Sequence, residues 1–150
     1  MHAFSAPIVD YVPANGRARV LLAHADPRQR RLHAASLRMS GYAVLAISDG
    51  DEAMNVLASI SDGDLAKPDH AMLDVNLPIY VALRVLQAVR RTSPEIPVII
   101  LSPRLNATLR ALIEQFDVFA CITKPVSSAV LLRALEAASN DLHEDRETTT

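Results

Sequence analysis

The segment Ala71–Pro78, with the sequence AMLDVNLP, decides the fold that we expect for this chain. Three apolar residues lead into Asp74, and a short polar turn then closes on Pro78. A strand that ends in a carboxylate and turns sharply places that acid at the carboxyl edge of a sheet. Open α/β sheets bind their ligands at this edge.

Two other apolar runs also end in residues that suit a phosphate group. The run VIIL at 98–101 leads into Ser102, and VFACIT at 118–123 leads into Lys124. Asp74, Ser102 and Lys124 can converge only if their strands lie side by side and parallel. We therefore expect a parallel sheet with a binding site at its carboxyl edge.

Five strand-like runs alternate with five helix-like segments along the chain. The runs lack a regular apolar–polar alternation, which is typical of strands covered by helices on both faces. Right-handed crossovers between such strands give a doubly wound sheet. The sequence thus predicts an α/β fold of the three-layer (βα)5 type, with parallel strands at 18–23, 42–48, 70–74, 97–102 and 118–123.

The first helix is expected to begin with Asp26 as its N-cap and Pro27 in its first turn, and to end at Gly41. Apolar residues at helical spacing predict the buried face of each helix. These are Leu32, Ala35 and Met39; Ala53, Met54, Leu57 and Ala58; Ala82, Val85, Leu86 and Val89; Leu109, Leu112, Ile113 and Phe116; and Val130, Leu131, Ala134, Leu135 and Ala138.

The 150 residues divide into three parts by composition. We expect residues 1–16 to form a flexible lead-in, residues 17–139 to form one domain, and residues 140–150 to form a disordered acidic tail. We find no internal repeats, and the remaining residues leave no room for a second domain.

Charge and composition exclude several classes of protein. A net charge of −2 without a cluster of Lys or Arg gives no electrostatic basis for binding nucleic acid. Apolar runs stay well short of the ~18 residues of a membrane span. The single cysteine, Cys121, rules out an internal disulfide, and we expect a reducing, cytoplasmic setting.

Four motifs occur in order along the chain: SDGDEAM at 48–54, PDHAMLDVNLP at 68–78, PEIPVIILS at 94–102 and ITKPV at 122–126. With these motifs the chain resembles the receiver domain of response regulators, the phosphoacceptor module of two-component signalling. The resemblance covers about residues 17–139 and implies the flavodoxin-like strand order 2-1-3-4-5.

The resemblance also implies a role for each strand-end residue. Asp74 would accept a phosphoryl group from a histidine kinase or phosphotransfer protein, and Ser102 and Lys124 would contact that group. A carboxylate nucleophile, a hydroxyl and a positive charge are what this transfer needs. Of the 15 basic residues, only Lys67 and Lys124 are lysines and the rest are arginines. A lysine at position 124 therefore favours a site that needs a compact charge rather than a planar guanidinium.

Each of these residues also has a structural interpretation. Asp74 could cap the following turn, Ser102 before Pro103 could be a helix N-cap, and Lys124 could be a surface charge. The three residues together, in this order and on these strands, favour the phosphoryl site.

The residues at the positions of the family's magnesium ligands differ in this chain. Receiver domains carry two acids after the first strand, and His24 and Ala25 stand there instead, with Asp26 one place later. Asp74, Asp26 and the backbone carbonyl of Asn76 are the remaining oxygen ligands, so we expect Mg²⁺ to bind weakly or not at all. We expect Asp74 and Lys124 to form a direct ion pair, with a single conformation of the domain.

The role of His24 has two interpretations. A hydrogen bond to Asp74 or Asp26, with a charge that modulates the pocket near pH 6–7, is favoured over a transition-metal site, because no second metal ligand lies at a recognisable spacing.

Further departures lie around the same pocket. Val81 and Ala82 replace the family's Asp-Gly, Pro103 replaces a small residue after the hydroxyl, and Cys121 replaces the aromatic residue that switches position. Pro125 matches the family, where it accompanies an unusual lysine–proline peptide conformation.

Three functions remain to be compared. The favoured one is a phosphorelay receiver that signals through contacts with a downstream protein. The second is a pseudo-receiver whose interactions or dimerisation do not depend on phosphorylation. The third, a flavodoxin-like or phosphatase-like enzyme, lacks a Gly-rich phosphate loop and a cysteine nucleophile followed by arginine. We therefore expect no enzyme activity.

A self-complementary charged surface on the fourth helix, fifth strand and fifth helix would favour a homodimer. Its charged residues are Arg104, Arg110, Glu114, Asp117, Arg133 and Glu136.

Overall fold

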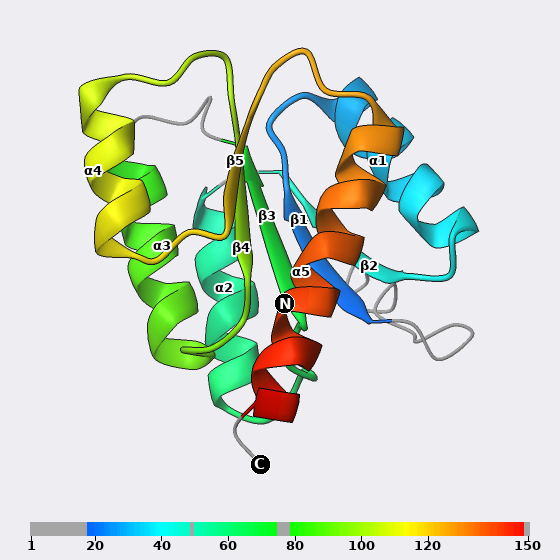
Figure 1. The fold of residues 1–150 in the computed structure, drawn as a ribbon. Helices are drawn as coiled ribbons and strands as arrows, with labels where there is room; N and C mark the ends of the chain where they lie inside the picture. Colours follow the sequence, from blue (N-terminus) through cyan, green and yellow to red (C-terminus); the bar gives the residue numbers. More distant parts are fainter. Residues whose placement is uncertain (1–17, 49, 75–78, 149–150) are drawn as a thin grey trace, which may run out of the picture.

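The computed structural model of the protein describes residues 18–48, 50–74 and 79–148. The predicted lead-in, residues 1–16, lies outside this part of the chain. Within it, strands and helices alternate as expected (Figure 1). In chain order they are β1 Arg19–Ala23, α1 Pro27–Met39, β2 Ala43–Ile47, α2 Gly50–Ser61, β3 His70–Asp74, α3 Ile79–Thr92, β4 Val98–Ser102, α4 Ala107–Gln115, β5 Ala120–Thr123 and α5 Ser128–Thr148.

All strand pairs in the sheet are parallel, and the strand order is β2-β1-β3-β4-β5. Helices α1 and α5 cover one face of the sheet, while α2, α3 and α4 cover the other (Figure 1). The predicted three-layer (βα)5 fold with order 2-1-3-4-5 is therefore confirmed.

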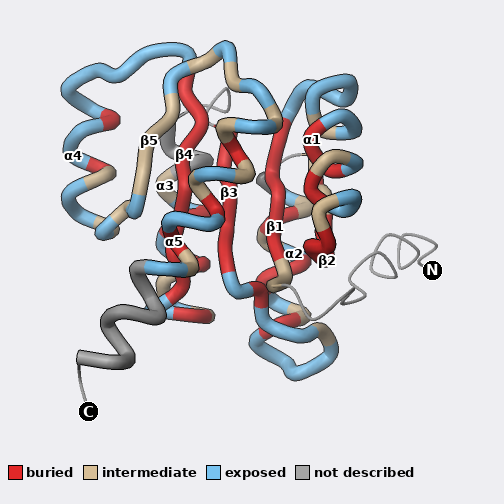
Figure 2. Tube along the Cα trace, turned by 45° about the vertical axis from the view of Figure 1, so that its right-hand side comes forward, coloured by how far each residue is buried: buried red, intermediate tan, exposed pale blue. Residues whose placement is uncertain are grey.

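Two hydrophobic clusters, one on each face, bury the central strands almost completely (Figure 2). Along β1, Leu21 joins the cluster beneath α2, α3 and α4, whereas Val20 and Leu22 join the cluster beneath α1 and α5. Successive side chains of a strand point to opposite faces, so helices on both sides require apolar residues at every position. This explains why the strands show no polar alternation.

Helix α1 begins and ends where the sequence predicts, but it buries a different face. The carboxylate of Asp26 caps its first turn, and Gly41 follows its end with a positive φ of 96°. The predicted buried face is wrong: Leu32 is 56% exposed and Met39 is 89% exposed. Ala35 is exposed as well.

The buried residues of α1 are His33, Ala34 and Leu37. His33 is accommodated because its Nδ1 lies 2.9 Å from the Oγ of Ser128, at the start of α5, which satisfies the polar atom of a buried ring. A pattern that counts only apolar residues treats this histidine as polar, and it therefore places the buried face of α1 incorrectly.

The other predicted faces agree more closely with the structure. Val85, Leu86 and Val89 of α3, Leu109 and Leu112 of α4, and Leu131, Leu135 and Ala138 of α5 are buried. Met54, Ile113, Phe116 and Ala134 are partly buried and pack against the two clusters. In α2, Ala53 and Leu57 are buried but Ala58 is exposed, and Val56 and Ile60 complete the buried face.

Helix α5 runs to Thr148, past Asn140, where the sequence predicts the disordered acidic tail to begin. The sequence of α5 contains neither glycine nor proline, which are the residues that commonly end helices. Near residue 140, the Oγ of Ser139 lies 3.2 Å from Nε2 of the buried His70, which joins α5 to the start of β3. Among the described helices, none is both long and apolar enough to cross a membrane.

Two leucines of α1 test which face of this helix is buried. Leu37 is 0% exposed, so Leu37→Ala should lower the free energy of unfolding by about 2–5 kcal/mol. Leu32→Ala, on the exposed face of the same helix, should change it by no more than about 0.5 kcal/mol. Urea denaturation of both variants measures the difference, and equal losses would contradict the observed face.

Candidate functional site

The carboxyl edge of the sheet brings the three predicted strand ends together. β3 ends at Asp74 and β4 ends at Ser102, while Lys124 directly follows β5. Neighbouring strands are in register here, with Asp74 opposite Leu101. The backbone N–H of Lys124 donates to the carbonyl of Ser102 at 2.7 Å.

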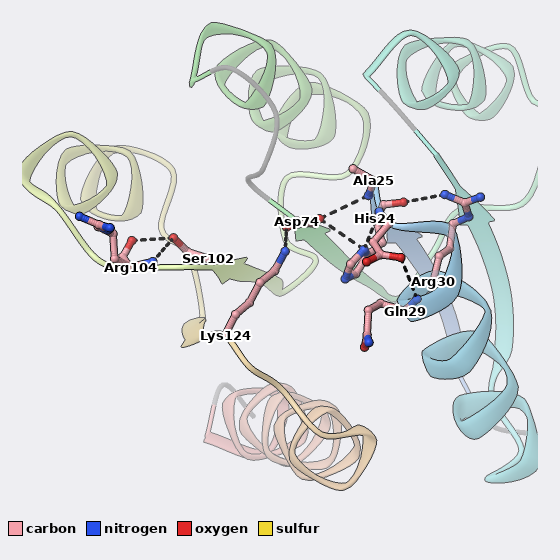
Figure 3. Close-up of polar contacts among 9 residues, drawn as sticks. His24, Ala25, Gln29, Arg30, Asp74, Ser102, Arg104 and Lys124 are labelled. Atoms are coloured by element: carbon pink, nitrogen blue, oxygen red, sulfur yellow. Dashed lines mark hydrogen bonds and ion pairs between the residues drawn. The ribbon is translucent and has the colours of Figure 1, made fainter.

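Asp74 is the centre of the polar network at this edge, and it is only 1% exposed. The ammonium of Lys124 forms an ion pair with its Oδ1. Its Oδ2 lies 3.3 Å from both the backbone N of Ala25 and the Nδ1 of His24 (Figure 3). A buried carboxylate needs such partners. The predicted ion pair between Asp74 and Lys124 is confirmed.

His24 is buried and contacts two groups through one nitrogen. Its Nδ1 lies 3.3 Å from Oδ2 of Asp74 and also 3.3 Å from the backbone N of Asp26. A ring nitrogen donates when it is protonated and accepts when it is not, so the two contacts require different proton positions. Both predicted partners of His24 are thus within reach.

The pKa of His24 is lowered, mainly because burial disfavours the charged ring. The carboxylate of Asp74 opposes this effect, and the charge of Lys124 adds to it. The neutral imidazole is therefore favoured at pH 7.

Asp26 faces the start of α1. Its Oδ1 accepts hydrogen bonds from the backbone N–H groups of Arg28 at 2.9 Å and Gln29 at 3.3 Å. These bonds lower the pKa of Asp26, and the bond from Gln29 has the larger effect. The predicted N-cap role is confirmed.

Ser102 lies at the expected edge, but its hydroxyl is held by its own loop. The Oγ donates to the carbonyl of Arg104 at 2.6 Å and accepts from the backbone N–H of Arg104 at 3.3 Å (Figure 3). The alternative role as an N-cap is wrong, because Asn106 caps α4 through a 2.8 Å bond to the backbone N–H of Leu109.

A pocket of about 540 Å³ opens beside this network. The predicted pocket residues His24, Asp26, Pro103 and Pro125 line it together with Lys124, and Ala25 contributes its N–H to Asp74. Asn76 falls outside the described residues. The remaining lining residues are Gln29, His33, Leu101 and Val126.

Comparison with known proteins identifies the family. The family model of the response regulator receiver domain matches residues 20–136. The chain belongs to this family. Response regulator MprA of Mycolicibacterium vanbaalenii is 32% identical over 92 residues, which cover 61% of this chain and 37% of the relative. MprA of Mycobacterium avium is also 32% identical, over 61% of this chain and 38% of the relative. The matched part thus spans little more than a third of these relatives.

Solved structures show the same fold. A CheY-like receiver domain protein from Methanospirillum hungatei has a TM-score of 0.74 at 20% identity, over 85% of this chain and 98% of that one. The chemotaxis protein CheY4 of Vibrio cholerae has a TM-score of 0.71 at 22% identity, over 82% and 99%. The receiver family serves signalling, normally binds Mg²⁺, and interacts with histidine kinases and downstream effector domains.

The residues at this edge of the sheet offer few of the oxygen ligands that Mg²⁺ requires. Ala25 offers no side-chain ligand, the carboxylate of Asp26 caps α1, and that of Asp74 is paired with Lys124. Mg²⁺ demands a near-octahedral set of oxygens, and imidazole is a poor substitute. In the described part of the chain, no three His, Cys, Asp or Glu side chains are grouped to hold a metal ion.

The remaining family positions are partly visible. Cys121 on β5, which the resemblance implies to be the switch position, is partly buried against the hydrophobic cluster beneath α4, and burial raises the pKa of its thiol. The Lys124–Pro125 peptide is cis, which is an unusual lysine–proline conformation as the resemblance implies. The side chains of Val81 and Ala82 lie outside the description.

Three residues of α1 at the site were not predicted. Gln29 and His33 line the pocket, and Nη1 of Arg30 donates to the carbonyl of His24 at 2.9 Å. The rings of His33 and His24 have centroids 5.9 Å apart, and burial is the main cause that lowers the pKa of His33. Gln29 and His33 are four residues apart in a helix that starts at the pocket, and this spacing was the available signal.

The ion pair between Asp74 and Lys124 predicts coupled effects on stability. Lys124→Met leaves a buried carboxylate without its cation and should lower the free energy of unfolding by about 2–3 kcal/mol, less than for a fully buried pair because Lys124 is 20% exposed. In an Asp74→Asn background the same substitution should cost at least about 1 kcal/mol less. Urea denaturation of the four proteins measures this coupling.

The exposed Lys67 supplies the control. Lys67→Met should leave stability nearly unchanged in both backgrounds. Additive losses for Asp74→Asn and Lys124→Met would show that the pair contributes nothing of its own.

Proposed function

We propose that this receiver domain passes on a signal through protein contacts, with Asp74 as the residue that accepts a phosphoryl group from a histidine kinase or phosphotransfer protein. The observation that carries the proposal is the pairing of Asp74, at the end of β3, with Lys124, which follows β5. A buried acid held by a lysine beside an open pocket has the parts that phosphoryl transfer to a carboxylate needs.

The chemistry follows from these parts. A carboxylate oxygen of Asp74 attacks the phosphorus of the donor and forms an O–P bond. The bond from phosphorus to the donor's nitrogen or oxygen breaks, and the leaving group takes its electron pair. The ammonium of Lys124 stabilises the charge on the phosphoryl oxygens. Ser102 joins them only after its hydroxyl exchanges the carbonyl of Arg104 for a phosphoryl oxygen.

The cofactor of this reaction in the family is Mg²⁺, and we expect its binding here to be weak or absent. The support is the loss of side-chain oxygens at positions 24 and 25 and the engagement of Asp26 at the start of α1.

A second function is favoured by the same network. Asp74 is already bound by Lys124, His24 and Ala25, and the hydroxyl of Ser102 is held by Arg104. A domain closed in this way suits an interaction module that works without phosphorylation. In either case we expect a cytoplasmic protein that acts on a downstream partner protein.

The surface of α4, β5 and α5 supports a homodimer in both cases. Its six predicted charged residues are all exposed, with both signs present, and the apolar residues Leu105 and Phe119 are exposed beside them. The charged residues are Arg104, Arg110, Glu114, Asp117, Arg133 and Glu136.

Incubation with acetyl phosphate separates the two functions. The wild type should gain the mass of one phosphoryl group, because the carboxylate of Asp74 displaces acetate from phosphorus. Asp74→Asn should gain none, and Asp64→Asn, in the exposed loop after α2, should behave like the wild type. Intact-mass measurement detects the change. A wild type that stays unlabelled would favour the phosphorylation-independent module.

Calorimetric titration with magnesium chloride tests the metal proposal. The wild type should bind Mg²⁺ with a Kd weaker than about 1 mM, because it lacks the oxygen ligands. The double variant His24→Asp/Ala25→Asp should bind at least about tenfold more tightly. Gln29→Asp places an acid on α1 in the same pocket and is the matched control, with little expected gain. Sub-millimolar binding by the wild type would contradict the proposal.

A further inference from the structure

The turn between β1 and α1 presents nitrogen donors to Asp74. The backbone N–H of Ala25 and the Nδ1 of His24 both approach the same carboxylate oxygen, Oδ2, at 3.3 Å. Lys124 reaches the other oxygen from the opposite side of the site (Figure 3). Three nitrogens from two separate parts of the chain therefore converge on one acid.

We infer that this turn is an oxyanion-binding element: the N–H of Ala25 and the Nδ1–H of His24, together with Lys124, hold a phosphoryl-type anion on Asp74 without a divalent ion. This inference rests on the proposed function, in which Asp74 carries the phosphoryl group. The ligand class is a tetrahedral anion such as a phosphoryl group or its fluoride analogue.

The distances leave capacity for such an anion. Charge-assisted N–H···O bonds are typically about 2.7–2.9 Å long, so the two contacts at 3.3 Å to Oδ2 are loose. A phosphoryl group adds oxygens and negative charge at the same place, and the pocket of about 540 Å³ beside His24 and Lys124 gives it room.

The turn is held in position by bonds outside the site. The N–H of His24 donates to the carbonyl of Ile47 at 3.0 Å, and its carbonyl accepts from Arg30 at 2.9 Å. The next residue but one, Asp26, caps α1. Donors held in this way need little reorganisation when an anion arrives, which is the condition for effective electrostatic stabilisation.

The two contacts of Nδ1 of His24 correspond to two positions of the proton on the neutral ring, and one of them is the position that the inference requires. With the proton on Nε2, the Nδ1 accepts from the N–H of Asp26; with the proton on Nδ1, it donates to Asp74. Both are forms of the neutral ring. An anion on Asp74 favours the second form, so the exchange needs no change in the charge of His24.

Beryllofluoride, the anion formed from beryllium and fluoride, tests the inference by ¹⁹F NMR. The wild type should show a bound signal in EDTA, and excess magnesium should leave the affinity unchanged. Asp74→Asn should abolish the signal. His24→Ala should weaken binding about tenfold through the loss of one hydrogen bond to a charged group. His24→Asn, whose amide N–H can donate in place of Nδ1–H, should recover most of the affinity.

Lys67→Met, in the exposed loop before β3 and outside the pocket, is the control and should bind like the wild type. Circular dichroism of each variant confirms folding. A signal that appears only with magnesium, no signal in either condition, or equal affinity of His24→Ala and wild type would overturn the inference.

Labelling by acetyl phosphate tests the proposed function separately from the inference. Labelling of Asp74 by acetyl phosphate only in the presence of magnesium would overturn the inference and leave the proposed function intact. Metal-free beryllofluoride binding without any labelling by acetyl phosphate would contradict phosphoacceptance by Asp74 but not the oxyanion-binding turn.

Discussion

A carboxylate buried at the end of a parallel strand is stable only if positive charge and hydrogen-bond donors reach it, and Asp74 places this requirement on the whole carboxyl edge of the sheet. In the order β2-β1-β3-β4-β5, β1 is a direct neighbour of β3, so the turn after β1 reaches Asp74 through short groups. β5 lies beyond β4, and the long stem of Lys124 spans that gap. The strand order thus determines which residue type can serve from each side.

Most of the fold could be predicted because apolar strands covered on both faces leave an unambiguous pattern. The structure differs from the expected pattern where a polar residue behaves as a core residue, and a helix extends where no residue stops it. His33 is buried with a hydroxyl partner from α5, a contact between segments 95 residues apart that helix periodicity does not encode. Beyond Asn140 the composition is polar and acidic, yet α5 continues because neither glycine nor proline interrupts it.

The candidate site, like the fold, could be predicted only in part. Strand ends predicted the positions of Asp74, Ser102 and Lys124, since register in a parallel sheet follows from the strand pattern. The direction of the Ser102 hydroxyl could not be predicted, because it depends on the turn that Pro103 and Arg104 adopt. The contributions of Gln29, Arg30 and His33 depend on how α1 packs, which is also where the predicted helix face was wrong.

Fold and chemistry are therefore determined by different residues of the same segment. Residues 20–23 are apolar and buried, and they hold β1 in the sheet. The next two residues decide the electrostatics: acids there would repel Asp74 and require a cation between them, whereas an imidazole and a bare N–H attract it. The residues at positions 24 and 25 can thus change one wall of the pocket from acidic to hydrogen-bond donating while the sheet beneath it stays the same. For this reason membership of the family does not by itself determine how Asp74 is used.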